Sequence, residues 1–282
     1  MISVHLLGGL GNQLFQIFTL IGYSIENNCS FIIPKEKPDK STNCGDPRPT
    51  YWNNLFKSLT CYLDINNVSK EFKIYNEENY HYTKIPFFKI QNIKLYGYFQ
   101  SHLYFEKYKE QIINLIKIKE TQQVIREKYK QYFQKHGEIV SLHFRIGDYK
   151  TIQIEGLILN INYYKKAIVK ILEKNNNVKN VLCFGQKKDY NLLIENIKKL
   201  KIMFPELNFI LCDFEIQDWE QLILMSCCDH NIIANSTYSW WGAYLNNSIQ
   251  KSVCIPEVWV GPESKYNKKD MYPGDWLKIG IQ

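Results

Sequence analysis

The segment HFRIGDY, residues 143–149, follows an apolar stretch and holds residue types that bind phosphate and move protons. The planar guanidinium of Arg145 can hydrogen-bond two phosphate oxygens at once. Gly147 lets the backbone pass close to a ligand, and Asp148 can orient Arg145 or accept a proton. An arginine–aspartate pair in a loop is also a common structural feature, so this segment alone leaves both interpretations open.

Hydroxyl groups are concentrated in a second segment, NSTYSWWG at 235–242, where a helix is expected to begin. Serine and threonine at such a position commonly cap the helix. The same hydroxyls, with the free N–H groups and the helix dipole, also make an anion site. Two segments that suit phosphate favour a diphosphate ligand more than either does alone. Trp240 and Trp241 are expected to pack in the core beneath the site rather than to stack on the ligand.

A glycine-rich segment, GGLGNQ at 8–13, matches a dinucleotide-binding loop only in part, because Leu14 occupies the last glycine position. No lysine followed by serine or threonine comes directly after this glycine-rich segment, which excludes a P-loop. The remaining interpretation is a cradle of backbone N–H groups that includes Gly9 and Gly11. Asn12 is expected either to cap the following helix or to point its amide at a ligand.

These segments lie between short apolar stretches and amphipathic ones, which is the pattern of an α/β protein. At the N-terminus we predict strands at 2–7 and 31–34, with a helix from residue 13 between them. Residues 38–100 show no sustained period, so we expect loops and short helices there. Two further helices are predicted at 104–118 and 121–135.

From residue 138 the alternation becomes regular. Strands are predicted at 139–144, 181–184, 209–212, 231–234 and 253–255, and helices at 162–172, 190–201, 219–227 and 239–245. This order predicts a parallel, Rossmann-type sheet, in which ligands bind at the carboxyl ends of the strands. The segments that follow residues 144 and 234 are therefore expected at one edge. We predict two domains, 1–136 and 137–282.

The composition is that of an ordinary globular protein, since 45% of the 282 residues are hydrophobic and 22% are charged. The net charge of +7 comes from scattered lysines, including those at 187–188 and 199–201, and indicates a solvated surface rather than a nucleic-acid footprint. The eight cysteines form no CxxC pair and no His/Cys cluster of zinc spacing. Cys183, Cys212 and Cys254 lie in apolar stretches, and the N-terminus has neither signal peptide nor transmembrane run, so we predict a cytoplasmic protein.

Five segments together make the sequence resemble the α-1,2-fucosyltransferases, which belong to a larger group of fucosyltransferases with the GT-B fold. In chain order they are GGLGNQLFQ at 8–16, GYFQS at 97–101, HFRIGDY at 143–149, LMSCCDHNIIANSTYSWWGAYL at 224–245 and PEVW at 256–259. The combination of HxRxGDY with NSTxSWWGAxL is specific, whereas GGLGNQ alone is moderately so. The resemblance covers nearly the whole chain.

The resemblance implies a GT-B-like α/β glycosyltransferase of two Rossmann-type domains that face a cleft, inverting and independent of metals or other cofactors. Its N-terminal half would mainly hold an oligosaccharide or glycoconjugate acceptor, and its C-terminal half the donor substrate, GDP-fucose. Arg145 would bind the pyrophosphate, and His143 would lie near the nucleoside. Asn12 would reach the donor from the opposite domain. Further donor-binding residues implied by the motifs are Gly9, Gly11, Asn235, Ser236 and Thr237.

The sequence departs from the family pattern on the nucleotide side. Gln221 stands where bacterial relatives usually carry an aspartate that pairs with guanine, and the adjacent Glu220 is a candidate to replace it. The usual FSDD segment is FGQK at 184–187. These departures leave open a different deoxysugar donor, linked to GDP, UDP or dTDP. A non-catalytic glycan-binding module is a third hypothesis, disfavoured because the key motif residues are intact.

The leading hypothesis is transfer of L-fucose from GDP-fucose to a sugar 2-hydroxyl with inversion, as in a galactoside α-1,2-fucosyltransferase. Arg145 and the helix start at Ser236 would stabilise the charge that grows on the leaving diphosphate. Asp148 and Glu155 are the candidate bases, although such transfer can proceed with little help from a base. The acceptor is expected to be shaped by residues 38–100.

Overall fold

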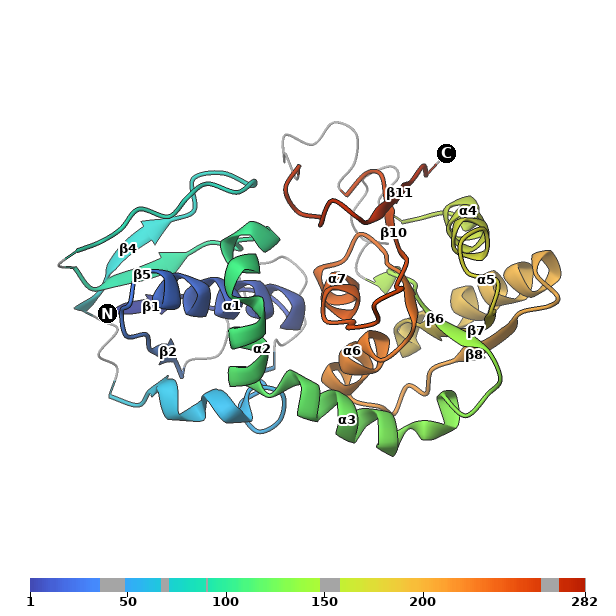
Figure 1. Ribbon diagram of the computed structural model, residues 1–282, viewed down its shortest axis with the longest axis horizontal. Helices are drawn as coiled ribbons and strands as arrows, with labels where there is room; N and C mark the ends of the chain where they lie inside the picture. The colour runs from blue at the N-terminus through green and yellow to red at the C-terminus, as the bar shows by residue number, and fades with distance from the viewer. Residues whose placement is uncertain (36–48, 67–70, 90, 148–157, 260–268, 282) are drawn as a thin grey trace. The chain divides into compact units, whose positions relative to one another are not determined.

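The computed structural model describes residues 1–35, 49–66, 71–89, 91–147, 158–259 and 269–281. The chain forms two compact units (Figure 1). Unit 1 consists of Met1–Glu120 together with the described part of Tyr266–Pro273. Unit 2 consists of the described parts of Thr121–Lys265 and Gly274–Gln282.

Unit 1 contains a three-stranded parallel sheet in which β5 (Ile93–Tyr96) lies between β1 (Ile2–Val4) and β4 (Lys73–Asn76). A parallel pair is formed by β2 (Ile33–Pro34) and β3 (Leu63–Asp64). After β1 the chain enters α1 (Leu10–Glu26), whose apolar side chains are buried except that of Ile25. The last helix wholly within unit 1 is α2 (Lys109–Ile116). Burial of the apolar side of α1 supplies much of the core of this unit.

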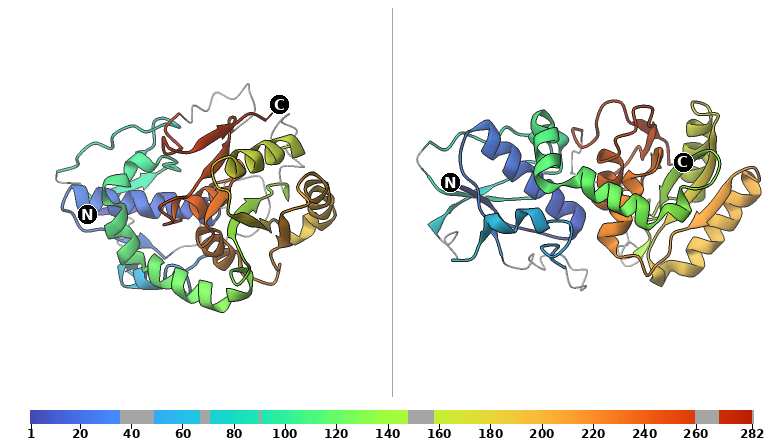
Figure 2. Two further views of the ribbon diagram at one scale, coloured as in Figure 1. Left: turned by 45° about the vertical axis from the view of Figure 1, so that its right-hand side comes forward. Right: turned by 60° about the horizontal axis from the view of Figure 1, so that its bottom comes forward.

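Unit 2 contains a six-stranded, fully parallel sheet in the order β11-β10-β9-β6-β7-β8. Its strands are β6 (Glu138–His143), β7 (Val178–Phe184), β8 (Asn208–Leu211), β9 (His230–Ile232), β10 (Val253–Pro256) and β11 (Leu277–Ile279). Its helices are α4 (Ile161–Leu172), α5 (Tyr190–Met203), α6 (Asp218–Ser226) and α7 (Thr237–Tyr244). Figures 1 and 2 show α4 and α5 on one face of this sheet and α6 and α7 on the other. This is the doubly wound arrangement expected of right-handed crossovers.

Helix α3 (Ile118–Lys128) begins in unit 1 and continues into unit 2. Gln122 Nε2 donates to Ser226 Oγ and to the Leu245 carbonyl, each at 2.9 Å. Arg126 donates to the Cys227 carbonyl at 2.8 Å. These bonds explain why the division falls between residues 120 and 121 and not at the expected 136/137 boundary.

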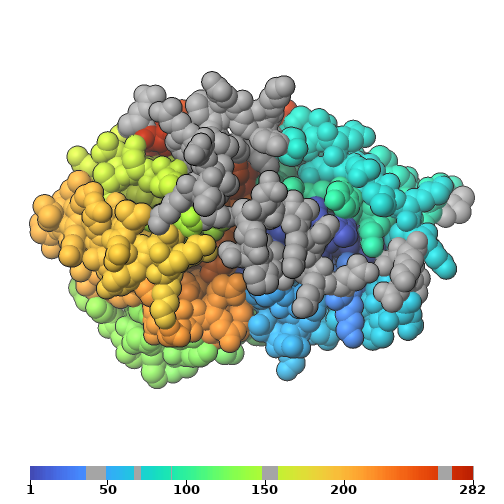
Figure 3. Space-filling view, turned by 180° about the vertical axis from the view of Figure 1, so that it is seen from behind, coloured from blue at the N-terminus to red at the C-terminus, as the bar shows by residue number. Residues whose placement is uncertain are grey.

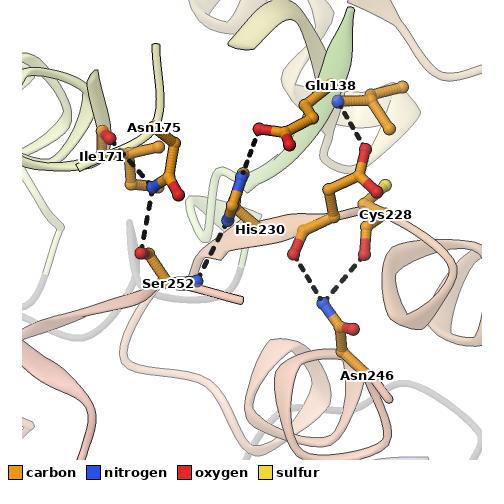
Figure 4. A network of polar contacts seen from close by, with 9 residues as sticks. Glu138, Ile171, Asn175, Cys228, His230, Asn246 and Ser252 are labelled. Atoms are coloured by element: carbon orange, nitrogen blue, oxygen red, sulfur yellow. Dashed lines mark hydrogen bonds and ion pairs between the residues drawn. The ribbon is translucent and has the colours of Figure 1, made fainter. Parts of the chain in front are cut away.

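A network of buried polar groups joins the amino ends of three strands in unit 2 (Figure 4). His230 Nδ1 accepts the Ser252 N–H at 3.0 Å, so the ring proton resides on Nε2, which lies 3.1 Å from Glu138 Oε2. Asn246 Nδ2 donates to the Cys228 carbonyl at 2.8 Å. The His230 side chain is only 1% exposed, so these bonds satisfy polar groups that water does not reach.

The lysine-rich surface is solvated, as expected from the sequence. Lys199 pairs with Glu195 on α5, and Lys187 pairs with Glu215 at 2.8 Å with both side chains about three-quarters exposed. Figure 3 shows α5 (gold) on the surface of unit 2. Among the described helices, none combines the length and apolar character needed to span a bilayer.

Most elements predicted after residue 138 are confirmed within a few residues, and Cys183, Cys212 and Cys254 are buried. The expectation of loops and short helices at 38–100 missed the strands β3, β4 and β5, which lie there beside a short 3₁₀-helix at Lys57–Tyr62. The residues of β4 are mostly exposed, so their sequence carries no hydrophobic alternation. The three-residue strand β11 was also not expected.

Candidate functional site

Strands β6 and β9 are neighbours in the sheet of unit 2, although α4, β7, α5, β8 and α6 lie between them in the chain. Leu142 on β6 pairs with Ile232 on β9. Arg145 and Asn235 each follow these paired residues by three positions, so the two segments leave the same sheet edge at the same level. Chain connections diverge to opposite sides here, which makes this edge the topological switch point where ligands bind in such sheets.

The segment after β6 is held in place by its neighbours. The Tyr164 hydroxyl donates to the His143 carbonyl at 3.3 Å, and the Phe144 N–H donates to the Phe184 carbonyl at 2.9 Å. The buried Asp189 accepts the Gly147 N–H at 2.7 Å. Gly147 has a φ of +30°, so any other residue there would strain the backbone, and its Cβ would also displace the Gln186 side chain. Arg145 is therefore presented from a fixed backbone.

His143 is buried beside Arg145. Its Nδ1 has no hydrogen-bond partner among the described residues. Burial, with a smaller contribution from the Arg145 charge, lowers the pKa of His143 from 6.5 to about 3. The imidazole is therefore neutral at physiological pH, and it lies with its ring centroid 5.6 Å from that of Tyr238 on α7. A buried polar atom without a described partner at a switch point is a candidate for a ligand contact.

Helix α7 begins at this edge, with Ser236 as its N-cap residue. The Ser236 hydroxyl makes no capping hydrogen bond, so the alternative that Ser236 caps the helix is wrong. The first-turn N–H groups of a helix have no partner within the helix, and no side-chain cap occupies them here. Together with the hydroxyls of Ser236 and Thr237, they are groups of the kind that bind anions at helix starts.

The remaining residues of this segment anchor it. Asn235 Nδ2 donates to the Trp259 carbonyl at 3.3 Å. Trp240 and Trp241 are fully buried, and Trp240 stacks on Tyr244 at 4.6 Å. The expectation that the two tryptophans pack in the core is confirmed.

Glu220 and Gln221 have structural partners in unit 2. The Glu220 carboxylate accepts Lys128 Nζ at 2.5 Å and the Tyr129 hydroxyl at 2.8 Å, and its side chain is 8% exposed. Gln221 Nε2 donates to the Ile216 carbonyl at 2.8 Å. The Glu220 carboxylate is thus engaged by α3 and the residue after it, which argues against its expected role of binding guanine.

The glycine-rich segment lies in unit 1 between β1 and α1. Gly9 is the N-cap of α1, and Gly11 is buried in its first turn, so the alternative that Asn12 caps the helix is wrong. Asn12 Oδ1 instead accepts Gln100 Nε2 at 2.9 Å. The expectation that Asn12 reaches the donor stays a prediction.

The two candidate bases, Asp148 and Glu155, lie outside the described residues. The structure brings together His143, Arg145, Asn235, Ser236 and Thr237 at one edge. Sequence reasoning missed Asp189 and Tyr164, which position the Arg145 segment. An acidic residue at the start of the helix after β7 pointed to Asp189 as a candidate. The sequence near Asp189 did not show that it accepts the N–H of Gly147.

Comparison with known proteins finds similarity to glycosyltransferases. The model of the family described as glycosyl transferase family 11 matches residues 1–280. The O-antigen biosynthesis glycosyltransferase WbnK of Escherichia coli is 30% identical over 192 residues, which cover 66% of this chain and 60% of that protein, less than two thirds of its length. The α-1,2-colitosyltransferase of Escherichia coli is 26% identical over an alignment of 307 residues, covering 99% of this chain and 98% of that protein.

Solved structures show the same fold. The Escherichia coli ADP-heptose LPS heptosyltransferase II superposes with a TM-score of 0.52 at 10% identity, covering 99% of this chain and 89% of that one. A glycosyl transferase family 9 protein from Veillonella parvula gives a TM-score of 0.50 at 10% identity, covering 99% and 85%. With the parallel sheets of both units, this likeness confirms the expected GT-B-like α/β fold.

Proposed function

Because the chain belongs to glycosyl transferase family 11, we propose that it transfers L-fucose from GDP-fucose to the 2-hydroxyl of an acceptor sugar. The transfer inverts the anomeric centre and needs no metal ion. The acceptor is a galactoside of an oligosaccharide or glycoconjugate. The α-1,2 linkage in the name of the relative that aligns over 99% of the chain supports this choice of hydroxyl.

The observation that carries the proposal is the pairing of β6 with β9. It puts a guanidinium and an uncapped helix start at one switch point, which suits a diphosphate. Arg145 is half-buried, so its charge acts in surroundings that screen it less than water does. The neutral His143 beside it offers a buried nitrogen to the nucleoside or to the sugar.

In this mechanism the acceptor oxygen attacks the anomeric carbon as the bond from that carbon to the diphosphate oxygen breaks. The leaving GDP carries away the bonding electron pair, and the acceptor hydroxyl loses its proton to a base or to solvent. Arg145 and the first-turn N–H groups of α7 stabilise the negative charge that develops on the diphosphate. Groups fixed before the reaction are effective because they need no reorganisation as the charge appears.

A second candidate donor is a nucleotide-linked colitose, since the relative that spans nearly the whole chain is named a colitosyltransferase. The contacts of Glu220 and Gln221 support this alternative donor. The Glu220 carboxylate, the candidate for recognising guanine, accepts hydrogen bonds from Lys128 and Tyr129, and Gln221 donates to the Ile216 carbonyl. UDP- and dTDP-linked deoxysugars belong to the same alternative.

A donor screen tests the proposal. The protein is incubated with lactose and one donor at a time from a panel of GDP-, UDP- and dTDP-linked sugars, and the product is detected by mass spectrometry. Calorimetry measures the affinity for free GDP, UDP and dTDP in parallel. The proposal predicts a fucosylated product and a preference for GDP; a preference for UDP or dTDP, or transfer of another sugar alone, contradicts it.

A further inference from the structure

A pocket of about 310 Å³ lies in unit 1, whereas the Arg145 segment belongs to unit 2. Its described lining residues are Leu7, Asn76, Glu77, Glu78, Asn79, Tyr80, Tyr96, Gly97 and Tyr98. They end β4 and β5 or follow β1, β4 and β5 within four residues, and these three strands are parallel (Figure 1). The pocket therefore occupies the sheet edge at which parallel α/β sheets bind ligands. Its volume is at the lower end of the range for small-molecule sites.

A fixed carboxylate forms part of the wall. Glu77 Oε2 accepts the backbone N–H groups of Tyr98 at 2.8 Å and of Phe99 at 3.0 Å. A Cβ on Gly97 would lie 2.4 Å from the Glu77 Cβ, so only glycine allows this close approach. The carboxylate is thus held in one orientation, which lowers the entropy cost of its hydrogen bonds to a ligand.

Aromatic rings form a second part of the wall. Tyr80 is 47% exposed and Tyr96 is 37% exposed, which is high for large side chains that line a pocket. The Tyr96 ring is stacked on His5 at a centroid distance of 5.0 Å and an interplanar angle of 20°. Such rings offer a rigid apolar face with a polar hydroxyl at one end. A pyranose, with apolar C–H faces and a rim of hydroxyls, is the complementary shape.

The charge of the pocket selects against the nucleotide. Among its described lining residues, Glu77 and Glu78 are acidic and none is basic. Acidic side chains repel a diphosphate but accept hydrogen bonds from hydroxyl groups. Asn76 and Asn79 add amide donors and acceptors. The lining therefore fits a neutral polyhydroxylated ligand.

The glycine-rich motif builds this pocket. Gln16 Oε1 accepts the Leu7 N–H at 2.9 Å, and Gln16 Nε2 donates to the Gly97 carbonyl at 3.1 Å. The side chain of Gln16 thereby ties two lining residues together. Asn12 and Gln100 join the same two segments a little further along. The last glutamine of GGLGNQLFQ thus has a role that phosphate chemistry does not explain.

We propose that this pocket binds a neutral pyranose of the acceptor glycan, with Glu77 accepting hydrogen bonds from its hydroxyls and with Tyr80 and Tyr96 contacting its C–H faces. This inference rests on the proposed glycosyl transfer, and it assigns the acceptor to the ends of β4 and β5.

The test combines sugar binding with kinetics. Saturation-transfer NMR measures binding of lactose, N-acetyllactosamine and glucuronic acid to the full chain. Glu77→Gln, Glu78→Gln and Tyr80→Ala are compared with Glu71→Gln and Phe87→Ala, which alter exposed residues of unit 1 outside the pocket. Steady-state kinetics gives separate KM values for acceptor and donor. Because Glu77 also holds the backbone, the exposed Glu78 and Tyr80 variants keep the test valid if Glu77→Gln folds poorly.

We expect both neutral disaccharides to bind and glucuronic acid not to bind. The pocket variants raise the acceptor KM by about tenfold, the effect of losing roughly one good hydrogen bond or stacking contact. The donor KM changes far less, and the two control variants behave as the wild type. Unchanged sugar binding in Tyr80→Ala and Glu78→Gln, or absence of disaccharide binding to the wild type, overturns the inference. The NMR measurement needs no donor, so it tests the pocket separately from the proposed function. Failure of the wild type to bind any nucleoside diphosphate in calorimetry would contradict the proposed function and not this inference.

Discussion

The ring of His143 lies 5.6 Å from the ring of Tyr238, at an interplanar angle of 49°. The first residue ends β6 and the second lies in the first turn of α7, so this contact joins the two segments that carry the phosphate-binding residue types. Arg145 and Ser236 flank the contact in sequence, two residues away on each side. This arrangement supports the proposal that a guanidinium and a helix start bind one ligand.

Replacement of Arg145 is expected to affect catalysis and not folding. Arg145→Ala should lower kcat/KM by about 100- to 1,000-fold, the loss typical of removing one group that stabilises developing charge. Arg145→Lys should keep only part of the wild-type kcat/KM, because an ammonium group lacks the planar pair of N–H donors of a guanidinium. Steady-state kinetics and circular dichroism provide the measurements, with the exposed Lys198→Ala as control. Near-normal activity of Arg145→Ala would refute its role.

His143 should make the protein less stable in acid. Burial and the Arg145 charge lower its pKa to about 3 in the folded protein, whereas in the unfolded chain it keeps its ordinary value of 6.5. Between these values the unfolded state binds a proton that the folded state does not, so the free energy of unfolding falls as the pH is lowered.

Urea unfolding between roughly pH 7 and pH 4 measures this effect. His143→Gln should flatten the dependence by up to about 1.4 kcal/mol per pH unit below pH 6. The exposed His136→Gln serves as the matched control. If the wild type and His143→Gln lose stability in parallel, the histidine is not held neutral.

Asp189 is a positioning residue, since it accepts the Gly147 N–H and so holds the segment that carries Arg145. Asp189→Ala should lower kcat by about tenfold, because a buried N–H that loses its acceptor shifts the Arg145 segment. Asp189→Asn keeps an oxygen acceptor and should restore most of the activity. Kinetics with the exposed Asp275→Ala as control checks this, and equal loss in the alanine and asparagine variants would speak against a positioning role.

Glu138 should contribute to stability through His230. Glu138→Ala leaves the buried Nε2–H of His230 without its acceptor, which costs about 1–3 kcal/mol of unfolding free energy. Glu138→Gln retains an acceptor and should cost less. Glu173→Ala, which breaks an exposed pair with Lys170, should cost under about 1 kcal/mol. Chemical denaturation compares the three, and equal losses for Glu138→Ala and Glu173→Ala would contradict the expectation.

Activity is expected to survive removal of divalent metals, because a guanidinium and a helix start supply the positive charge at the diphosphate. Transfer rates are measured after dialysis against EDTA and again after addition of Mg²⁺ or Mn²⁺. Rates should agree within about twofold, close to the scatter of such assays and worth under half a kcal/mol. If EDTA abolishes activity and added metal restores it, the expectation is contradicted.

The order of elements in unit 2 was predictable because its strands are buried and its helices are amphipathic. Val181 and Leu182, both fully buried on β7, belong to a continuous apolar stretch that identifies a strand inside a parallel sheet. By contrast, β4 lies at a sheet edge with exposed side chains such as Ile74, so its pattern resembles that of a loop. A segment shows a hydrophobic period in its sequence when one of its faces is buried. Elements with little burial lack this period and are therefore not predicted.

The sequence by itself determined which segments carry chemistry, since Arg145, Ser236 and the glycine-rich loop each stand beside an apolar stretch. Only the tertiary structure decided their partners. In the tertiary structure β9 pairs with β6, Glu220 forms an ion pair with Lys128, and Asp189 accepts the Gly147 N–H. The fold also forms the pocket that Glu77 lines. Local periodicity reports whether a residue is buried, whereas its neighbour across the sheet depends on packing between segments far apart in the chain.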